Sequence, residues 1–439
     1  MNLREKRKEK FYESLKMGRR SFLGKTGIMA ASAALLSIPG LRGEAKGAGP
    51  HDITPHRAPD RYGSAHVTYV PTTENNLGTT RFVGPRKQIN EGDQGFSKAA
   101  AGRLGPEAQR NMFRFAAKHP LGAAMQDISY MMGTEPFVMG TPATEKLPIP
   151  DPERMTKHIK ELGLFLRADD VGVGHMIHSA SYATKNIRIR QPDGTERAET
   201  RTEDNSSHKY VITFIVDQDL RTFLGSTGYD GISIAQSYRS YTATALISVM
   251  VASYIRRMGY NARAHHSGNY NMVLAPNMIS SGMGELTRAQ ECVAHPRFGT
   301  RWKGAIVSTD LPLLPDTPIA FGVREFCEKC MKCAEECPAK CMSTNKEQNE
   351  DNGIMRWSGD AAKCTMFRIG NNKGVSCGRC MKVCPLNNKE DSWFHSLGMQ
   401  TMGRFPSAGG LLRDMDDMLG YGTEEIEQFK WWIDWPERY

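Results

Sequence analysis

Cysteine spacing is the feature that most constrains this chain. Its 439 residues include ten cysteines, most of them in two motifs, Cys-x2-Cys-x2-Cys-x3-Cys-Pro and Cys-x2-Cys-x3-Cys-Pro. The motif cysteines are Cys327, Cys330, Cys333 and Cys337, then Cys377, Cys380 and Cys384. The first spacing is that of a bacterial ferredoxin loop, whose thiolates bind iron–sulfur clusters. The motifs therefore predict two [4Fe–4S] clusters.

The ferredoxin rule also predicts the ligands, because the Cys-Pro cysteine of such a loop usually binds the other cluster. The first cluster would then take Cys327, Cys330, Cys333 and Cys384. The second would take Cys337, Cys364, Cys377 and Cys380, with twelve residues between the second and third of these. Cys341 is the alternative to Cys364 as fourth ligand, and Cys292 is unassigned.

Two other uses of these cysteines are less favoured. A disulfide framework is typical of small exported domains that lack a core, and this chain is long. A zinc site needs paired Cys-x2-Cys motifs, but neither the third cysteine three residues on nor the trailing proline. Clusters explain the whole pattern.

The N-terminal residues are typical of a twin-arginine export signal. Arg19-Arg20-Ser-Phe-Leu follows a basic segment and precedes a moderately apolar stretch over 28–38, as such signals require. Residues 1–47 are therefore predicted to be a signal peptide, with the twin-arginine export machinery as a partner. This route moves folded proteins, so clusters can be inserted before export.

The charge distribution argues against nucleic acid as a partner. Residues 1–47 hold eleven Lys or Arg and four Asp or Glu, and therefore seven of the nine net positive charges. A basic balance that comes from a leader does not describe a binding face. Beyond the leader we find no run of about eighteen apolar residues.

Local patterns predict a mixed α+β chain. Residues 209–217 and 305–310 are expected to be strands. Helices are expected over 106–118, over 151–162 with a stop at Gly163, and over 238–258 with a stop at Gly259. Residues 48–110, rich in Pro, Gly, Thr and Asn, are expected to be extended and loop-dominated. A domain boundary is expected near 318–321.

The residues before the clusters contain no Walker motif, no convincing Gly-x-Gly-x-x-Gly loop and no His-Glu-x-x-His. Two clusters form a short electron-transfer chain, and the electron acceptor should lie in this upstream part of the sequence. Residue chemistry alone does not identify that acceptor.

Several segments together resemble the corrinoid-dependent reductive dehalogenases of organohalide-respiring bacteria. They are Phe321-Gly-Val-Arg-Glu-Phe-Cys327, Cys364-x12-Cys377, Tyr241 with Met258-Gly-Tyr260, Ser267-Gly-Asn269, Gly282-Met-Gly-Glu-Leu-Thr-Arg288, Phe298-Gly-Thr-Arg301 and Ser308-Thr-Asp-Leu311. The resemblance is close over about 205–390 and weak over 48–200. It implies a variable region over 48–204 that wraps the core, a nitroreductase-like corrinoid-binding core over 205–320, a ferredoxin-like module over 321–390 and an extension over 391–439.

The resemblance also implies function. Electrons would pass through both clusters to the cobalt of a base-off cobamide, and a halogen of a small halogenated hydrocarbon would be replaced by hydrogen. This would be the terminal step of anaerobic organohalide respiration. The implied partners are an electron donor of the respiratory chain and a small membrane-anchor subunit. The protein would be peripheral, on the outer face of the cytoplasmic membrane or in the periplasm.

The site residues follow from the same resemblance. Tyr241 matches the family's proton donor and Asn269 its pocket asparagine. A cation lowers the pKa of such a tyrosine from about 10. Both Lys303 and Arg301 match its place, with a slight preference for Lys303. Tyr238 is the rival proton donor, because it lies on the same helical face.

Other features have ordinary explanations. The pair His265-His266 invites a metal-ligand interpretation, but base-off binding needs no protein histidine. Trp357 and Trp393 are candidates for a substrate pocket, although core packing is the common role of such residues. Two alternative functions stay open: an epoxyqueuosine-reductase-like corrinoid enzyme, and an exported electron-transfer subunit without catalysis.

Overall fold

The computed structural model describes a large central part of the chain and several shorter segments. The described residues are 62, 66–190, 196–202, 205–289, 292–372, 375–387, 393–405, 409–418, 421 and 423–435. The export signal predicted over 1–47 lies outside them. Among the described residues, no helix is both long and apolar enough to cross a membrane.

A four-stranded antiparallel sheet carries the centre of the fold, in the order β4-β7-β11-β8. Its strands are β4 (Asp170–His175), β7 (Tyr210–Asp217), β11 (Trp302–Thr309) and β8 (Ala262–His265). β7 is buried on both faces, because helices cover both. The strands predicted over 209–217 and 305–310 are thus confirmed, although β11 begins three residues earlier than expected.

Alternate residues of β7 contribute to two different cores. Ile212 and Phe214 pack with the apolar residues of α10 (Ile232–Arg257) and α8 (Pro152–Phe165). Val211 and Ile215 pack on the opposite face, with α11 (Leu274–Ser280). This alternation is what the two-residue period of a strand requires. The sheet is therefore a middle layer between helices.

The long helix α10 is confirmed but begins six residues before its predicted start. It ends where expected: Gly259 has a φ of +86°, which a residue with a Cβ rarely adopts. Helix α5 (Pro106–Arg114) stops four residues short of the prediction.

Helix α8 corrects one prediction. It runs through Gly163 and ends at Phe165, with Arg167 turning the chain at a φ of +74°. Gly163 serves packing instead, because a Cβ there would lie 2.6 Å from Val171 Cγ2 and 2.8 Å from Phe214 Cε1. The sequence alone does not distinguish a glycine that makes room between a helix and a sheet from a glycine that ends a helix.

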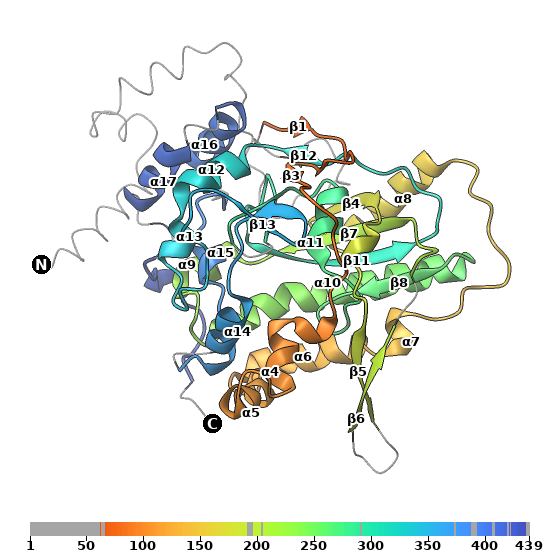
Figure 1. The fold of residues 1–439 in the computed structure, drawn as a ribbon, viewed down its shortest axis with the longest axis horizontal. Helices are drawn as coiled ribbons and strands as arrows, with labels where there is room; N and C mark the ends of the chain where they lie inside the picture. Colours follow the sequence, from red (N-terminus) through yellow and green to blue (C-terminus); the bar gives the residue numbers. More distant parts are fainter. Residues whose placement is uncertain are drawn as a thin grey trace, which may run out of the picture.

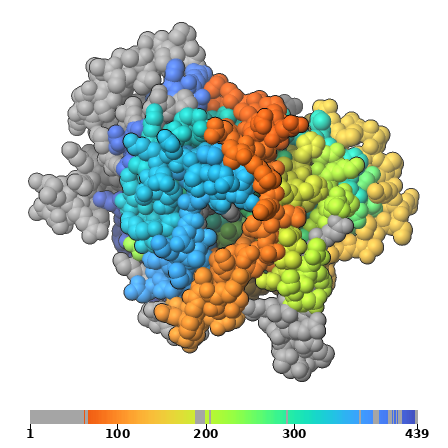
Figure 2. All heavy atoms as spheres, in the orientation of Figure 1, coloured from red at the N-terminus to blue at the C-terminus, as the bar shows by residue number. Residues whose placement is uncertain are grey.

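The N-terminal described residues cross the surface between the sheet and the cysteine-rich part, as the orange band in Figure 2 shows. Residues 66–90 are largely extended, as predicted, but a helix follows at α4 (Gly95–Ala100), where loop was expected. Its Ala99 packs in one buried cluster with residues of α5, α10 and the cysteine-rich part. The other elements of this region are β1 (Thr68–Tyr69), β2 (Asn76–Leu77), β3 (Thr80–Arg81), η1 (Glu91–Asp93), α6 (Pro120–Met132), α7 (Glu135–Val138), η2 (His178–Ala180), β5 (Lys185–Arg190) and β6 (Glu196–Arg201).

The cysteine-rich part lies beside the sheet, on the opposite side of the molecule from α8 (Figure 1). It is built from short elements: α12 (Val323–Cys330), α13 (Lys332–Glu335), β13 (Asn349–Asp351), β14 (Ile354–Arg356), α14 (Ala361–Gly370) and α15 (Arg379–Lys382). Around it lie α9 (Leu220–Gly225), β9 (Glu285–Leu286), β10 (Val293–Ala294), β12 (Ile319–Ala320), α16 (Trp393–Arg404), α17 (Gly409–Met418) and η4 (Glu427–Phe429). The predicted domain boundaries stay predictions.

Candidate functional site

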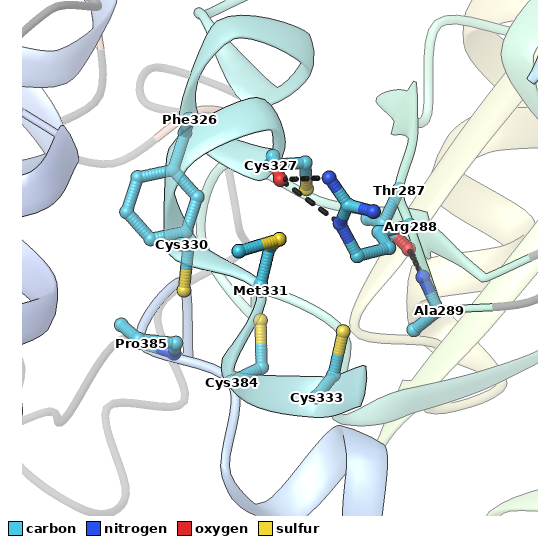
Figure 3. Close-up of a pocket in the computed structure, with 10 residues that line it drawn as sticks. All are labelled: Thr287, Arg288, Ala289, Phe326, Cys327, Cys330, Met331, Cys333, Cys384 and Pro385. Carbon is cyan, nitrogen blue, oxygen red and sulfur yellow. Dashed lines mark hydrogen bonds between the residues drawn. The ribbon is translucent and has the colours of Figure 1, made fainter. Parts of the chain in front are cut away.

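Four thiols surround one pocket in the cysteine-rich part. They belong to Cys327, Cys330, Cys333 and Cys384, the set predicted for the first cluster, and Figure 3 shows their sulfur atoms around a common space. Three of them come from α12 and α13, and the fourth follows α15. Sequence-distant thiols therefore meet as the ferredoxin rule predicts.

Local backbone geometry aims these thiols. Helix α12 ends at Cys330, and Met331 then takes a left-handed conformation, with a φ of +49°, before α13 begins. This single residue reverses the chain around the pocket. A non-glycine residue with positive φ is uncommon and often marks a functional constraint.

Arg288 joins the first pocket to the sheet-bearing part. Its guanidinium donates to the carbonyl oxygen of Cys327 at 3.0 and 2.9 Å and to that of Asn345 at 2.6 Å. It also lies 4.5 Å from the ring centroid of Trp357. Trp357 is 3% exposed, donates to a backbone carbonyl and packs in one buried cluster with Cys327 and Cys330, so it belongs to the core.

The second predicted thiol set also comes together. Cys337 follows α13, and Cys364 lies in the first turns of α14. Cys377 precedes α15, and Cys380 lies in its first turn. Cys364 interacts electrostatically with both Cys377 and Cys380. Cys380 interacts with Cys333 of the first set too, so the two sets are neighbours.

The rival residue Cys341 lies at the edge of this second set. Its sulfur is 3.5 Å from that of Cys337, and its thiol also bonds that of Cys364. Five thiols are thus gathered where a cluster needs four. Cys292 is half-buried and interacts electrostatically with Cys380.

Burial makes several of these thiols poor acids, whereas hydrogen bonding to the Cys341 thiol lowers the pKa of Cys337 to about 5 and that of Cys364 to about 7. Desolvation raises the pKa of Cys330 to about 12 and that of Cys377 to about 11, because a thiolate without a cation is unstable in an apolar setting. Over the described ranges, no three His, Cys, Asp or Glu side chains converge as ligands of a single metal ion. The thiols of a cubane bind different iron atoms, so they are spread more widely than the ligands of one ion.

Tyr241 and Lys303 meet between the sheet and the cysteine-rich part. Tyr241 is half-buried on α10, and the ammonium nitrogen of Lys303, on β11, lies 5.2 Å from its ring centroid. The same nitrogen donates to Met381 Sδ at 3.3 Å. Met381 directly follows Cys380, so Lys303 connects the tyrosine to the second thiol set.

The rival tyrosine has a different environment. Tyr238 is 7% exposed, its ring centroid lies 6.0 Å from that of Tyr241, and its hydroxyl accepts from Gln126 Nε2 at 2.7 Å. Burial raises the pKa of Tyr238 well above its usual range. Tyr238 is therefore a weaker acid than an ordinary phenol.

Arg301 bonds to residues at the end of β7. It is 1% exposed, forms an ion pair with Asp217 and donates to the carbonyl oxygen of Gln218 at 3.0 Å. These bonds connect the start of β11 to the end of β7. Its observed contacts are those of a structural arginine.

Asn269 lies among cations that the sequence analysis did not identify. Its side-chain oxygen accepts from Lys185 and, at 3.0 Å, from Arg263, while its amide donates to Gly133 O at 2.7 Å. Lys185 belongs to a distant hairpin, so no local pattern indicated it. Tyr270, next in the chain, interacts electrostatically with Tyr241, and burial raises its pKa.

The histidine pair is structural. His265 Nε2 lies 2.8 Å from Ser308 Oγ, and His266 Nε2 lies 3.3 Å from Met132 O. Both rings are fully buried. Burial lowers the pKa of His266 to about 4, so the ring is neutral near pH 7.

Comparison with known proteins defines the class first. The family described as "4Fe-4S dicluster domain" matches residues 326–388, which contain both motifs. This part of the chain is an iron–sulfur module.

Relatives that match a larger part of the chain are reductive dehalogenases. The tetrachloroethene reductive dehalogenase of Desulfitobacterium hafniense is 33% identical over 223 residues, which cover 48% of this chain and 39% of that protein. The structure of the catabolic reductive dehalogenase NpRdhA is 32% identical, with a TM-score of 0.76 over 85% of this chain and 52% of that one. A structure titled as suggesting a mechanism for B12-dependent dehalogenation is 31% identical, with a TM-score of 0.75 over 85% and 52%.

The chain is thus a homologue of the reductive dehalogenases and shares their mixed helix–strand fold. It spans about half the length of the relatives it matches.

Proposed function

We propose that the protein is a reductive dehalogenase that replaces a halogen of a small halogenated hydrocarbon by hydrogen. One observation carries the proposal: Lys303 contacts the ring of Tyr241 on one side and Met381, next to Cys380, on the other. A proton donor, a cation that tunes it and the thiols of an electron carrier are then neighbours. Homology to reductive dehalogenases supports the same conclusion.

The electron carriers would be two [4Fe–4S] clusters. The first would be held by Cys327, Cys330, Cys333 and Cys384, and the second by Cys337, Cys364, Cys377 and Cys380. The four thiols around the first pocket fit such a group. The electrostatic interaction between Cys380 and Cys333, one from each set, supports electron passage from one cluster to the other.

The electron acceptor would be a base-off cobamide in the sheet-bearing, nitroreductase-like part. Figure 2 shows a hollow where the orange, green and blue parts of the chain meet. In the segment that follows Asn269, the side-chain oxygen and nitrogen of Asn271 are both buried with no hydrogen-bond partner among the described residues. Buried amides need partners, and a corrinoid ring carries peripheral amides that could supply them. When bound, the cobalt would supply the electrons that break the carbon–halogen bond.

The chain's own residues would manage the proton. Tyr241 would donate its phenolic proton to the carbon that loses the halogen. Lys303, a compact positive charge, would stabilise the phenolate that remains. Asn269, held by Lys185, Arg263 and Gly133, would present a rigid polar wall to the substrate. Arg301 would position β11 through Asp217.

Location and partners are also part of the proposal. The sequence of residues 1–47 supports twin-arginine export to the outer face of the cytoplasmic membrane or the periplasm. There the protein would be peripheral, attached through a small membrane-anchor subunit and supplied with electrons by the respiratory chain.

The experiment that tests the function is cofactor analysis with a substrate panel. Anaerobically purified protein should contain about eight iron atoms, from two cubanes of four, and one corrinoid. With a low-potential reductant it should release halide from halogenated alkenes or phenols. Full iron loading without corrinoid would instead indicate an electron-transfer subunit.

A further inference from the structure

The second thiol set contains one cysteine more than a [4Fe–4S] cluster binds. Cys341 is 5% exposed, so its thiol lies inside the protein. It contacts Cys337 at 3.5 Å between sulfur atoms and bonds the thiol of Cys364. Those two cysteines are both expected ligands of the same cluster. Cys341 therefore touches two ligands at once.

The backbone holds Cys341 in this place. A turn brings it back toward Cys337: Lys340 N donates to Cys337 O at 3.1 Å, and Lys340 has a φ of +47°. The carbonyl oxygen of Cys341 accepts from Asp360 N at 2.7 Å. Asp360 is the N-cap of α14, the helix that carries Cys364. The backbone of Cys341 is thus held beside the helix of Cys364 by main-chain bonds.

Interactions with two of the remaining ligands favour Cys364 as the ligand in the resting state. Cys377 and Cys380 both interact electrostatically with Cys364. Cys364 is therefore taken as the fourth ligand, and Cys341 is the thiol in contact with it. The arrangement is a ligand with a second thiol in contact.

We propose that Cys341 is a reserve ligand of the second cluster, able to replace Cys364 on the same iron atom. In the exchange the bond from iron to Cys364 sulfur breaks and a bond from iron to Cys341 sulfur forms. The proton of the Cys341 thiol passes to the Cys364 sulfur along the hydrogen bond that already joins them. No oxidant or reductant is needed. The proposal rests on the second cluster of the proposed function but not on dehalogenation.

The test compares alanine variants, since serine oxygen could itself bind iron. Cys364→Ala should keep about eight iron atoms per chain and the electron paramagnetic resonance spectrum of two reduced [4Fe–4S] clusters. Cys364→Ala/Cys341→Ala should lose the second cluster or convert it to a [3Fe–4S] form, which has a distinct signal in the oxidised state. Cys341→Ala alone should resemble the wild type.

The matched control is Cys364→Ala/Cys292→Ala, because Cys292 is the remaining cysteine near Cys380. It should behave like Cys364→Ala. The proposal is overturned if Cys364→Ala already lacks the second cluster, or if removing Cys341 from that variant changes nothing. The four irons of the first cluster report whether each variant has folded. Wild-type protein with only four irons would overturn both this proposal and the two-cluster reading, whereas eight irons without dehalogenation would affect the proposed function alone.

Discussion

The cysteine-rich part and the sheet-bearing part build their sites in different ways. Around the first pocket, three of four thiols come from one short stretch, Cys327 to Cys333, with a left-handed turn at Met331. Tyr241 and Lys303 come from a helix and a strand that meet only through the packing of α10 on β11. Local spacing along the chain therefore specifies the first thiol pocket, whereas packing in a shared core specifies the pairing of Tyr241 with Lys303. The two should respond differently to mutation.

Arg288 connects the two parts, so its replacement should not affect one part alone. We expect this replacement to have the largest effect. Arg288→Met removes the bonds to Cys327 O and Asn345 O that fix the first pocket. Buried carbonyls left without donors are costly, so the first cluster should be lost. Iron should fall from about eight to about four atoms per chain, and activity to background. Arg297→Met, which alters an exposed arginine, should retain full iron.

Tyr241→Phe should separate the two parts most clearly. The change keeps the ring and removes only the acidic hydroxyl, so iron and corrinoid contents should equal those of the wild type. Dehalogenation should fall at least about a hundredfold, the lower end for a lost general acid. Single-turnover halide release measures it. Tyr238→Phe is the matched control and should keep most activity; if the two results are exchanged, the proton donor is one helical turn away.

Lys303→Met should have a smaller effect on the same reaction. Methionine keeps a similar length without the charge, so the phenolate loses its stabilising cation and turnover should fall about tenfold, or about 1.4 kcal/mol in barrier height. Thermal stability should barely change. Arg301→Met should do the reverse, because it breaks the ion pair between the buried guanidinium and Asp217, and breaking a buried pair costs about 3–5 kcal/mol of folding free energy. A large loss of stability in Lys303→Met, with turnover unchanged, would contradict the assignment.

Gly163→Ala should weaken the sheet-bearing part alone. The new Cβ would meet Val171 and Phe214 at 2.6–2.8 Å, and overpacking of this kind costs about 1–3 kcal/mol. Denaturant unfolding followed by tryptophan fluorescence should show the loss. Gly410→Ala is the control, because nothing lies within 4 Å of its Cβ position. Equal effects of the two changes would mean that the contact at Gly163 relaxes freely.

Much of the fold could be predicted where a pattern is local. The strand over 209–217 and the stop at Gly259 followed from β-branched composition and from glycine's access to positive φ. The predicted helix stop at Gly163 was wrong. Glycine is needed there because Val171 and Phe214 leave no room for a Cβ, and rules for helix ends do not include such tertiary contacts. The helix over 95–100 was missed, since it is stabilised by packing against α14 and α5.

The sequence by itself determined which cysteines could bind clusters, because ligand spacing within a loop is a property of a short chain segment. It gave only a slight preference for Lys303 over Arg301, and it left Cys341 as an alternative to Cys364. Tertiary structure decided what these residues contact: it paired Arg301 with Asp217, brought Lys303 to the ring of Tyr241 and placed Cys341 against both Cys337 and Cys364. Side-chain partners across a core depend on which elements pack together, and that information is distributed over the whole chain.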